Sequence, residues 1–158
     1  MTRRALLLAC ALALAGCASP PRTITGSESY WSGRMALRVD SAPPQSFAAS
    51  FELQGSPEQG RLSLSTALGT SLATLTWTPA GAEMRQGNTV TRRDSVDALM
   101  AELAGAAVPL PALFAWMRGD NLSVPGWQTD LSQRGNGRLT ARRADPLPTA
   151  ELRLIIEP

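Results

Sequence analysis

Cys17 is the side chain best placed to do chemistry, because its thiol directly follows the small residues Leu-Ala-Gly at positions 14–16. Arg3 and Arg4 make the N-terminus basic, and residues 5–14 are almost wholly aliphatic. A basic segment, a short apolar segment and small residues at the point of cleavage are typical of a secretory signal. The apolar run is about half of the roughly 20 residues that a transmembrane helix needs. We therefore expect a cleaved signal here and not a membrane span.

A cysteine directly after Leu-Ala-Gly resembles the bacterial lipoprotein signal, in which the thiol is lipidated and the cysteine becomes the first residue of the mature chain. The resemblance implies a lipoprotein signal peptide at residues 1–16 and a lipidated flexible tether at residues 17–29, which is rich in proline, glycine and hydroxyl side chains. The folded domain is then expected at residues 30–158. An ordinary signal peptide with a chance cysteine is the alternative interpretation. Ala18 follows the cysteine, where the common enterobacterial signal for inner-membrane retention has aspartate, so the sequence favours the outer membrane.

The residue types that are missing exclude many enzyme mechanisms. The chain contains no histidine, which excludes Ser-His-Asp catalysis, Cys-His catalysis and zinc bound through histidine. All 15 basic residues are arginine, so no lysine is available for a Walker A loop, a Schiff base or a Ser-Lys dyad. Paired carboxylates remain possible in principle, but the acidic residues fall on outward-facing strand positions. We expect no enzyme, no catalytic residue, no metal and no cofactor.

Composition and length indicate one neutral globular domain. The sequence is 44% hydrophobic and 18% charged, and 141 of its 158 residues follow Cys17, which is enough for a single core. Once Arg3 and Arg4 are removed with the signal, 13 basic residues balance 13 acidic ones. A neutral domain is a poor binder of nucleic acid. No disulfide is expected in the mature fold, because Cys10 lies in the removed segment and Cys17 is expected to be acylated.

Most of the domain alternates apolar and polar residues with a period of two, which predicts antiparallel strands that are buried on one face. Such strands are expected near residues 31–39, 47–54, 61–66, 71–78, 82–86, 89–93, 127–131, 138–142 and 150–157, with a hairpin turn at 135–137. The period changes to that of a helix at residues 96–103, with Asp94 or Ser95 as the N-cap and Gly105 at the end. A second helix is expected from Pro111 to Gly119. The predicted architecture is one meandering sheet of about nine strands, interrupted once by a helical pair.

Two short helices can cover only part of the long apolar face of such a sheet. The face must then curl around on itself or be covered by something else. Aromatic and flexible side chains dominate the inward positions, among them Trp31, Phe47, Phe51, Trp77 and Met84. Methionine adapts to partners of varied shape. Two interpretations stay open at this point: a hydrophobic cavity, and a packed core that the helices plug.

Three local patterns resemble the LolB family of outer-membrane lipoproteins. Trp-Ser-Gly-Arg-Met-Ala at residues 31–36 opens the first strand. Leu-Ser-Leu-Ser-Thr-Ala-Leu-Gly-Thr at residues 62–70 is similar to the family's strand followed by a Pro-Leu-Gly or Ala-Leu-Gly loop. The most specific match is the helical pair, which runs from Leu103 through Val-Pro-Leu at residues 108–110 to Leu113, Trp116 and Gly119. The patterns occur in order across roughly residues 30–158, together with the lipoprotein signal.

The resemblance implies a mainly β fold with helices: a single curved antiparallel sheet that forms an unclosed β-barrel, with a helical lid over a hydrophobic cavity. It also implies a monomeric receptor at the periplasmic face of the outer membrane, anchored by lipidated Cys17. Such a receptor accepts acylated lipoproteins from the periplasmic carrier LolA and inserts them among the lipids of the inner leaflet of the outer membrane. The side chains expected to line the acyl-chain cavity are Trp31, Met35, Leu37, Phe47, Phe51, Leu53, Leu64, Trp77, Met84, Leu99, Met100, Leu103, Leu113, Trp116 and Met117.

Leu68 and Gly69 match the family's exposed loop, whose leucine is implicated in membrane insertion. An apolar residue stands here between two strands, where a polar turn residue is usual. A leucine folded back under the hairpin is the alternative. Two arginine pairs, at residues 92–93 and 142–143, either steer an acidic surface of the carrier or act as solvated charges at strand edges.

Three rival functions follow from the same sequence. The main one is a structural lipoprotein with a filled core, which stabilises an outer-membrane complex through its surface. A lipid carrier like LolA shares the general fold, but it lacks a lipid anchor. An envelope hydrolase conflicts with the missing histidine and lysine.

Overall fold

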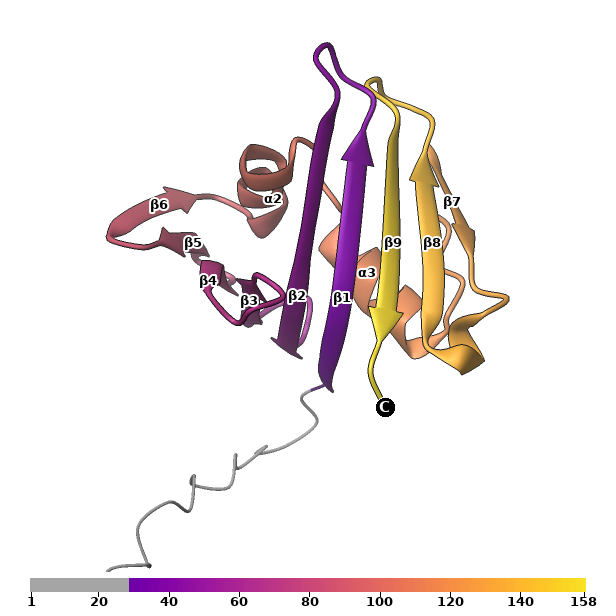
Figure 1. Cartoon of the computed structure of the whole chain (residues 1–158), viewed down its shortest axis with the longest axis horizontal. Helices are drawn as coiled ribbons and strands as arrows, with labels where there is room; N and C mark the ends of the chain where they lie inside the picture. The colour runs from indigo at the N-terminus through magenta and orange to yellow at the C-terminus, as the bar shows by residue number, and fades with distance from the viewer. Residues whose placement is uncertain (1–28) are drawn as a thin grey trace, which may run out of the picture.

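Nine strands form a single antiparallel sheet in the computed structural model, which describes residues 29–158 (Figure 1). The strands are β1 (Ser29–Val39), β2 (Gln45–Gly55), β3 (Gly60–Ser65), β4 (Ser71–Thr78), β5 (Gly81–Gln86), β6 (Thr89–Arg93), β7 (Trp127–Asp130), β8 (Arg138–Arg143) and β9 (Ala150–Ile156), and the helices are α2 (Val96–Ala104), α3 (Leu110–Arg118) and the 3-10 helix η1 (Arg134–Asn136). The order across the sheet is β6-β5-β4-β3-β2-β1-β9-β8-β7, and the outer strands β6 and β7 do not pair within this part of the chain. The barrel is therefore unclosed, as predicted. The predicted signal peptide, Cys17 and the predicted tether up to residue 28 lie outside the described residues.

The strand order departs from a simple meander at one point. β9 pairs with β1, from Gly33 opposite Ile156 to Val39 opposite Ala150. The chain passes from β6 through the two helices to the far edge of the sheet, and it returns inward through β7 and β8. Gly33 allows this close pairing, because a Cβ there would lie 2.0 Å from the carbonyl oxygen of Ile155. Alternation predicts that a strand is half buried, but it does not specify which strand lies beside it.

The apolar positions of the strands share one side of the sheet. In β1, Met35, Leu37 and Val39 are buried while Arg34 and Arg38 are exposed. The same alternation runs through β2, β4 and β9. Both helices lie against the apolar side (Figure 1), and their buried residues join the strands in one hydrophobic cluster.

The capping residues of the two helices are those that the sequence predicted, although α3 begins one residue earlier than expected, at Leu110. The Ser95 hydroxyl accepts a hydrogen bond from the Ala98 N–H, and Gly105 ends α2 in the left-handed conformation with a φ of 82°. Pro111 lies in the first turn of α3, and Gly119 ends that helix with a φ of 97°. No helix among residues 29–158 is long and apolar enough to cross a bilayer.

The reversal between β7 and β8 differs from the predicted hairpin turn at residues 135–137. The helix η1 occupies this connection, and Gly137 ends it with a φ of 73°. A Cβ at Gly137 would lie 2.5 Å from the carbonyl oxygen of Ile156. The glycine is needed because the neighbouring strand passes so close, which a local turn pattern does not reveal.

Candidate functional site

The apolar side of the sheet gathers all fifteen side chains that the sequence assigned to an acyl-chain cavity. Twelve of them are buried in one cluster: Met35, Leu37, Phe51, Leu53, Leu64, Trp77, Met84, Leu99, Met100, Leu113, Trp116 and Met117. Trp31, Phe47 and Leu103 are partly buried and pack against the same cluster. The alternation in the strands and the helical spacing therefore place these residues together between the sheet and the helices.

The hollow inside this cluster is small. Its volume is about 20 Å³ and its lining is entirely apolar. The side chains around it are Met35, Phe51, Leu53, Leu62, Met100, Val108, Leu113, Met117, Leu152 and Leu154. A space of this size holds about one water molecule. In this conformation a hydrocarbon chain enters only if the helices move away from the sheet.

Four lining residues were missing from the predicted set. Leu62, Leu152 and Leu154 lie at inward positions of β3 and β9, so the alternation already marked them. Val108 lies in the connector between the helices, where an irregular backbone gives no periodic signal.

Aromatic contacts fix α3 against the sheet. The Phe114 ring meets two tryptophans edge-on, with ring centroids 5.5 Å from Trp31 and 6.4 Å from Trp77. The Trp116 ring lies 5.8 Å from that of Trp127 at the start of β7. Trp116 is therefore fully buried and connects α3 to β7. It is not among the side chains that line the hollow.

Two hydrogen bonds secure the C-terminal end of α3. The Trp116 indole N–H donates to the Leu122 carbonyl at 3.0 Å. The Arg134 Nε donates to the Met117 carbonyl at 2.6 Å, which satisfies one of the carbonyls that a helix leaves unpaired at its end. The helix is held along its length and at its end.

The other helix, α2, contains no aromatic residue, and its polar contacts lie at its two ends. Asp97 in its first turn accepts a hydrogen bond from the backbone N–H of Leu110, with Oδ1 3.2 Å from the nitrogen. In its last turn, Glu102 forms an ion pair with Arg93 on β6, and both side chains are substantially exposed. Such pairs contribute little to stability. Burial raises the pKa of the Asp97 carboxyl, and the hydrogen bond from Leu110 opposes that rise.

The β3–β4 loop holds Leu68 out in solvent, with its side chain 95% exposed. Beneath it, the Thr66 N–H donates to the Thr70 carbonyl at 2.8 Å, and the Thr70 N–H donates to the Thr66 hydroxyl at 3.1 Å. Gly69 takes a φ of 84°, and its N–H donates to the Thr66 carbonyl at 2.9 Å. The alternative in which Leu68 folds back under the hairpin is wrong.

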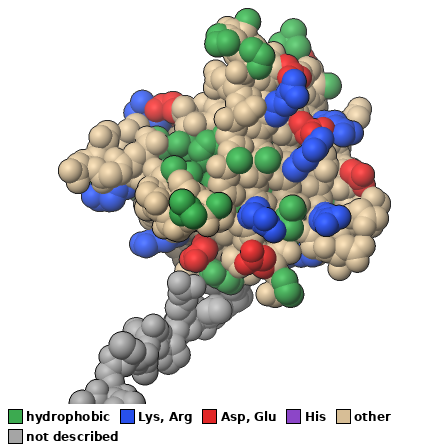
Figure 2. Space-filling view, viewed as in Figure 1, with side chains coloured by type: hydrophobic (Ala, Val, Ile, Leu, Met, Phe, Trp, Pro, Cys, Tyr) green, Lys and Arg blue, Asp and Glu red, His purple; other side chains and the backbone are tan. Residues whose placement is uncertain are grey.

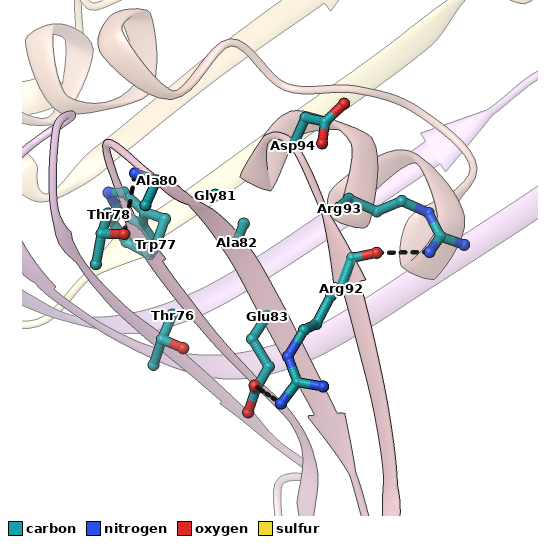
Figure 3. Close-up of a pocket in the computed structure, with 10 residues that line it drawn as sticks. All are labelled: Thr76, Trp77, Thr78, Ala80, Gly81, Ala82, Glu83, Arg92, Arg93 and Asp94. Atoms are coloured by element: carbon teal, nitrogen blue, oxygen red, sulfur yellow. Dashed lines mark hydrogen bonds and ion pairs between the residues drawn. The ribbon is translucent and has the colours of Figure 1, made fainter.

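An open pocket of about 450 Å³, lined by both charged and apolar side chains, lies around the β4–β5 turn and the end of β6 (Figure 3). Glu83 and Arg92 point toward one another there and form an ion pair at 2.8 Å, while Arg93 donates to the Arg92 carbonyl at 2.7 Å. The pocket is larger than the interior hollow, but it is open and charged, so it does not suit a hydrocarbon chain. No group of three or more acidic or cysteine side chains in residues 29–158 is arranged to hold a metal ion.

The two arginine pairs have different surroundings. Arg92 and Arg93 are exposed on the edge strand β6, where the sequence placed solvated edge charges. Arg142 and Arg143 lie on β8, which has β7 on one side and β9 on the other. The interpretation of this second pair as edge charges is wrong.

The Arg143 side chain is buried and supports the β8–β9 loop, so it is not a surface charge. It is 8% exposed, its Nη2 donates to the Pro148 carbonyl at 2.8 Å, and its guanidinium lies 6.0 Å from the centroid of the Trp127 ring. Its Nε is buried without a hydrogen-bond partner in the described chain. The alternation that turns Leu139 and Ala141 inward also turns Arg143 inward, so the sequence held the signal. Its charge is therefore not available to steer a carrier.

Similarity to known proteins covers most of the folded domain. The family model of the outer membrane lipoprotein LolB matches residues 29–146. The chain belongs to the LolB family. It is 34% identical over 141 residues to the outer-membrane lipoprotein LolB of Cupriavidus metallidurans, covering 84% of this chain and 68% of that protein. The LolB of Bordetella petrii is 30% identical over 175 aligned positions (93% and 87%), and that of Chromobacterium violaceum is 28% identical over 144 (86% and 77%).

The LolB match confirms the resemblance drawn from three short patterns, and the structure shows where those patterns lie. Residues 31–36 belong to β1, residues 62–70 form the end of β3 and the Leu68 loop, and residues 103–119 cover the connector and α3. The match to the LolB model ends at residue 146, within the loop between β8 and β9.

Proposed function

We propose that this protein is an outer-membrane lipoprotein receptor. It accepts acylated lipoproteins from the periplasmic carrier LolA and inserts them into the inner leaflet of the outer membrane, where lipidated Cys17 anchors it at the periplasmic face. Membership of the LolB family supports the role of an outer-membrane lipoprotein in lipoprotein localisation. The observation that carries the receptor step is a wholly apolar hollow enclosed between the sheet and a pair of helices.

Transfer through such a site needs no nucleotide. Burial of an acyl chain stabilises it by about 0.8 kcal/mol per methylene, so small differences per group become large over a whole chain. Transfer then runs downhill if each successive site shelters the chain better than the last. The receptor must bind the chain more weakly than the bilayer does, because otherwise the cargo would stay bound.

The receptor takes up its ligand by displacement of α2. The hollow has to grow many times over to hold an acyl chain, and α3 is tied down by Phe114, Trp116 and Arg134. α2 packs against β2, β4, β5 and β6, but it contains no aromatic residue and is followed by a connector that starts at Gly105. Its outward movement uncovers Met100, whose flexible side chain adapts to chains of different shape.

Leu68 serves the release step. Its side chain stands in solvent, and full burial of a leucine is worth about 1.5–3 kcal/mol. Because this free energy is small, a single leucine inserts reversibly into a bilayer surface and orients the loop. It does not hold the protein there, which is the role of the acyl chains at Cys17.

A displacement assay tests the receptor site. A hydrophobic fluorescent probe is expected to bind the full-length protein saturably, and long-chain fatty acid or an acylated lipoprotein is expected to displace it. Val108→Phe fills the hollow and should weaken probe binding, whereas Val124→Phe, at a partly buried site outside the hollow, should not. Depletion of the protein in cells should leave outer-membrane lipoproteins misplaced. A protein without a saturable site, in cells whose lipoproteins stay correctly placed, is not a receptor.

The small volume of the hollow favours one second candidate, a structural lipoprotein whose filled core serves only stability. Such a protein binds no acyl probe, and its removal disrupts an outer-membrane complex while lipoprotein placement stays normal. The probe assay and the depletion experiment separate the two functions.

A further inference from the structure

A second apolar surface lies at the tips of two neighbouring loops. The β1–β2 loop exposes Ala42, Pro43 and Pro44, and the β8–β9 loop exposes Pro146 and Leu147, whose side chain is 78% exposed. We call these five residues the apolar crest. Figure 2 shows hydrophobic side chains gathered at this end of the molecule, over the tips of both loops. Isolated exposed leucines are common on proteins, but five exposed apolar residues on two neighbouring loop tips form a patch that calls for a partner.

The two loops of the crest are fastened to each other. The Asp40 N–H donates to the Thr149 carbonyl at 2.9 Å, and the Thr149 hydroxyl donates to Asp40 Oδ2 at 2.9 Å. The Ser41 hydroxyl donates to the Pro43 carbonyl at 2.7 Å within the first loop. The bases of the two loops are therefore tied to each other.

The β8–β9 loop is also braced from below. The buried Arg143 donates to the Pro148 carbonyl at 2.8 Å, and the Ala144 N–H donates to the Gly126 carbonyl at 2.8 Å. A Cβ at Gly126 would lie 1.7 Å from the Asp145 carbonyl oxygen, so the connection before β7 passes directly against the loop. A leucine held out by a fixed backbone cannot bury itself by local rearrangement. The buried arginine therefore stabilises a loop that presents Leu147 to solvent.

The Leu68 loop and the two loops of the crest follow strands that run in the same direction, but the Leu68 loop begins beside the middle of β2 (Figure 1). Successive strands are antiparallel throughout, so the β1–β2, β3–β4 and β8–β9 loops all follow strands that run in one direction. Ser65 at the end of β3 pairs with Ser50, five residues along β2 from its start at Gln45. The Leu68 loop is therefore set back from the crest by roughly 17 Å along the strands. Two separate loops therefore present exposed leucines at different heights along the sheet.

Three arginines and three carboxylates lie beside the crest, and one of these carboxylates is the exposed Asp145, which directly precedes Pro146. Arg38 pairs with Asp40 at 3.2 Å, Arg142 pairs with Glu151 at 2.6 Å, and Arg153 also contacts Glu151. The crest thus offers apolar contact without a net charge to attract anionic headgroups or an acidic protein surface. A hydrocarbon boundary suits this chemistry better than a charged partner does.

The chain before β1 is long enough to let the crest meet the membrane. The crest lies at the end of β1 farthest from Ser29, roughly 35 Å away for a strand of 11 residues. Ser29 follows Cys17 by twelve residues, which span at most about 40 Å when extended. A lipid anchor at Cys17 therefore allows the far edge of the sheet to face the bilayer.

We propose that the apolar crest is a second membrane-contact surface, which seats on the lipid bilayer beside the Leu68 loop. The proposal rests on the proposed function only in assuming that the protein acts at the lipid bilayer. Contact at two separated points fixes the edge of the sheet against the membrane, whereas Leu68 alone leaves the domain free to pivot on its loop.

Lipid-borne quenchers test this contact in the full-length acylated protein. An environment-sensitive fluorophore is attached through Leu147→Cys, Leu68→Cys or Glu58→Cys, the last being an exposed position on the β2–β3 turn at the opposite edge. The protein is reconstituted in phosphatidylcholine vesicles whose acyl chains carry nitroxides. Quenching at position 147 is expected to be at least twofold stronger than at position 58, and it should not change when 30% phosphatidylglycerol or high salt is added.

The outcomes separate this proposal from the proposed function. Quenching at position 68 without quenching at position 147 overturns the crest as a membrane contact and leaves the receptor in place. Protection of position 147 only after the carrier protein is added also overturns it, because the crest is then a protein-docking surface. Leu147→Glu, compared with Leu122→Glu at another exposed leucine, should reduce quenching at position 68 at least twofold while saturable binding of the acyl probe stays unchanged. Equal effects of the two substitutions count against the crest.

Discussion

The side chain of Leu68 is surrounded by solvent, and the loop beneath it is closed by its own hydrogen bonds. Leu68→Glu replaces an apolar tip by a charge and leaves those backbone bonds in place. We expect this variant to bind the acyl probe with unchanged affinity and to deliver lipoprotein to vesicles at least tenfold more slowly, because about 1.5–3 kcal/mol of membrane contact is lost. Probe titration and a vesicle transfer assay measure the two activities. Equal loss of both would contradict a role confined to release.

Arg143 and Arg142 are neighbours in sequence with opposite roles. Arg143→Ala removes a buried, charged hydrogen bond to Pro148 and the contact with Trp127, so the free energy of unfolding should fall by about 2 kcal/mol. Arg142→Ala removes an exposed ion pair with Glu151, which is worth less than about 1 kcal/mol. Chemical denaturation of the two variants compares them directly. Losses of equal size would show that the buried arginine does not brace the loop.

At the scale of the helices, Asp97 connects the start of α2 to the start of α3. Burial raises the pKa of its carboxyl above the ordinary value of 3.8, so the folded protein holds this proton more tightly than the unfolded chain does. Its contribution to stability is therefore greatest at low pH and falls as the pH rises from about 3.8 through the raised value. At neutral pH the buried charge works against the folded state, while the hydrogen bond to Leu110 works for it.

Asp97→Asn and Asp97→Ala separate those two effects. Asparagine keeps an oxygen for the Leu110 N–H without the charge, so we expect its free energy of unfolding at pH 7 to equal or exceed that of the parent. Alanine removes the acceptor and should lower that free energy by about 1 kcal/mol. The difference in the free energy of unfolding between Asp97→Asn and the parent should shrink when denaturation is repeated near pH 4. A difference that grows at low pH would show that the pKa of Asp97 is not raised by folding.

The elements themselves were largely predictable from the sequence, because each leaves a local signal. β4 and β6 have the bounds expected from alternation, and Ser95, Gly105 and Gly119 mark the ends of the helices. The insertion of β9 beside β1 was not predictable, since a pairing between distant segments leaves no trace in either segment alone. The same reason hid the role of Gly126, whose importance comes from its close approach to Asp145 in a distant loop. The candidate acyl-binding residues were found by alternation, whereas the volume that they enclose depends on how they pack.

At the scale of the whole molecule, the apolar residues that the proposed function uses lie in two separate places. One is the interior between the sheet and the helices, which is nearly filled. The other is the set of loops that carries Leu68 and the apolar crest. The proposed lipoprotein transfer requires both, because a chain sheltered inside the domain must leave where the domain meets the bilayer. In this proposal the domain holds its apolar loops against the membrane while α2 moves.

The proposed lipid anchor at Cys17 and the proposed membrane contact of the loops have different tasks, which Cys17→Ala separates. The variant lacks the thiol that would carry the acyl chains, but it keeps every described residue of the domain. We expect unchanged binding of the acyl probe and, with carrier and vesicles in excess, delivery within about twofold of the anchored protein. In cells its delivery should fall much further, since several acyl chains anchor a protein stably and exposed loops bind only transiently. If the unanchored protein binds the probe but fails to deliver even to excess vesicles, the anchor takes part in transfer itself, and the loops are not sufficient to engage the bilayer.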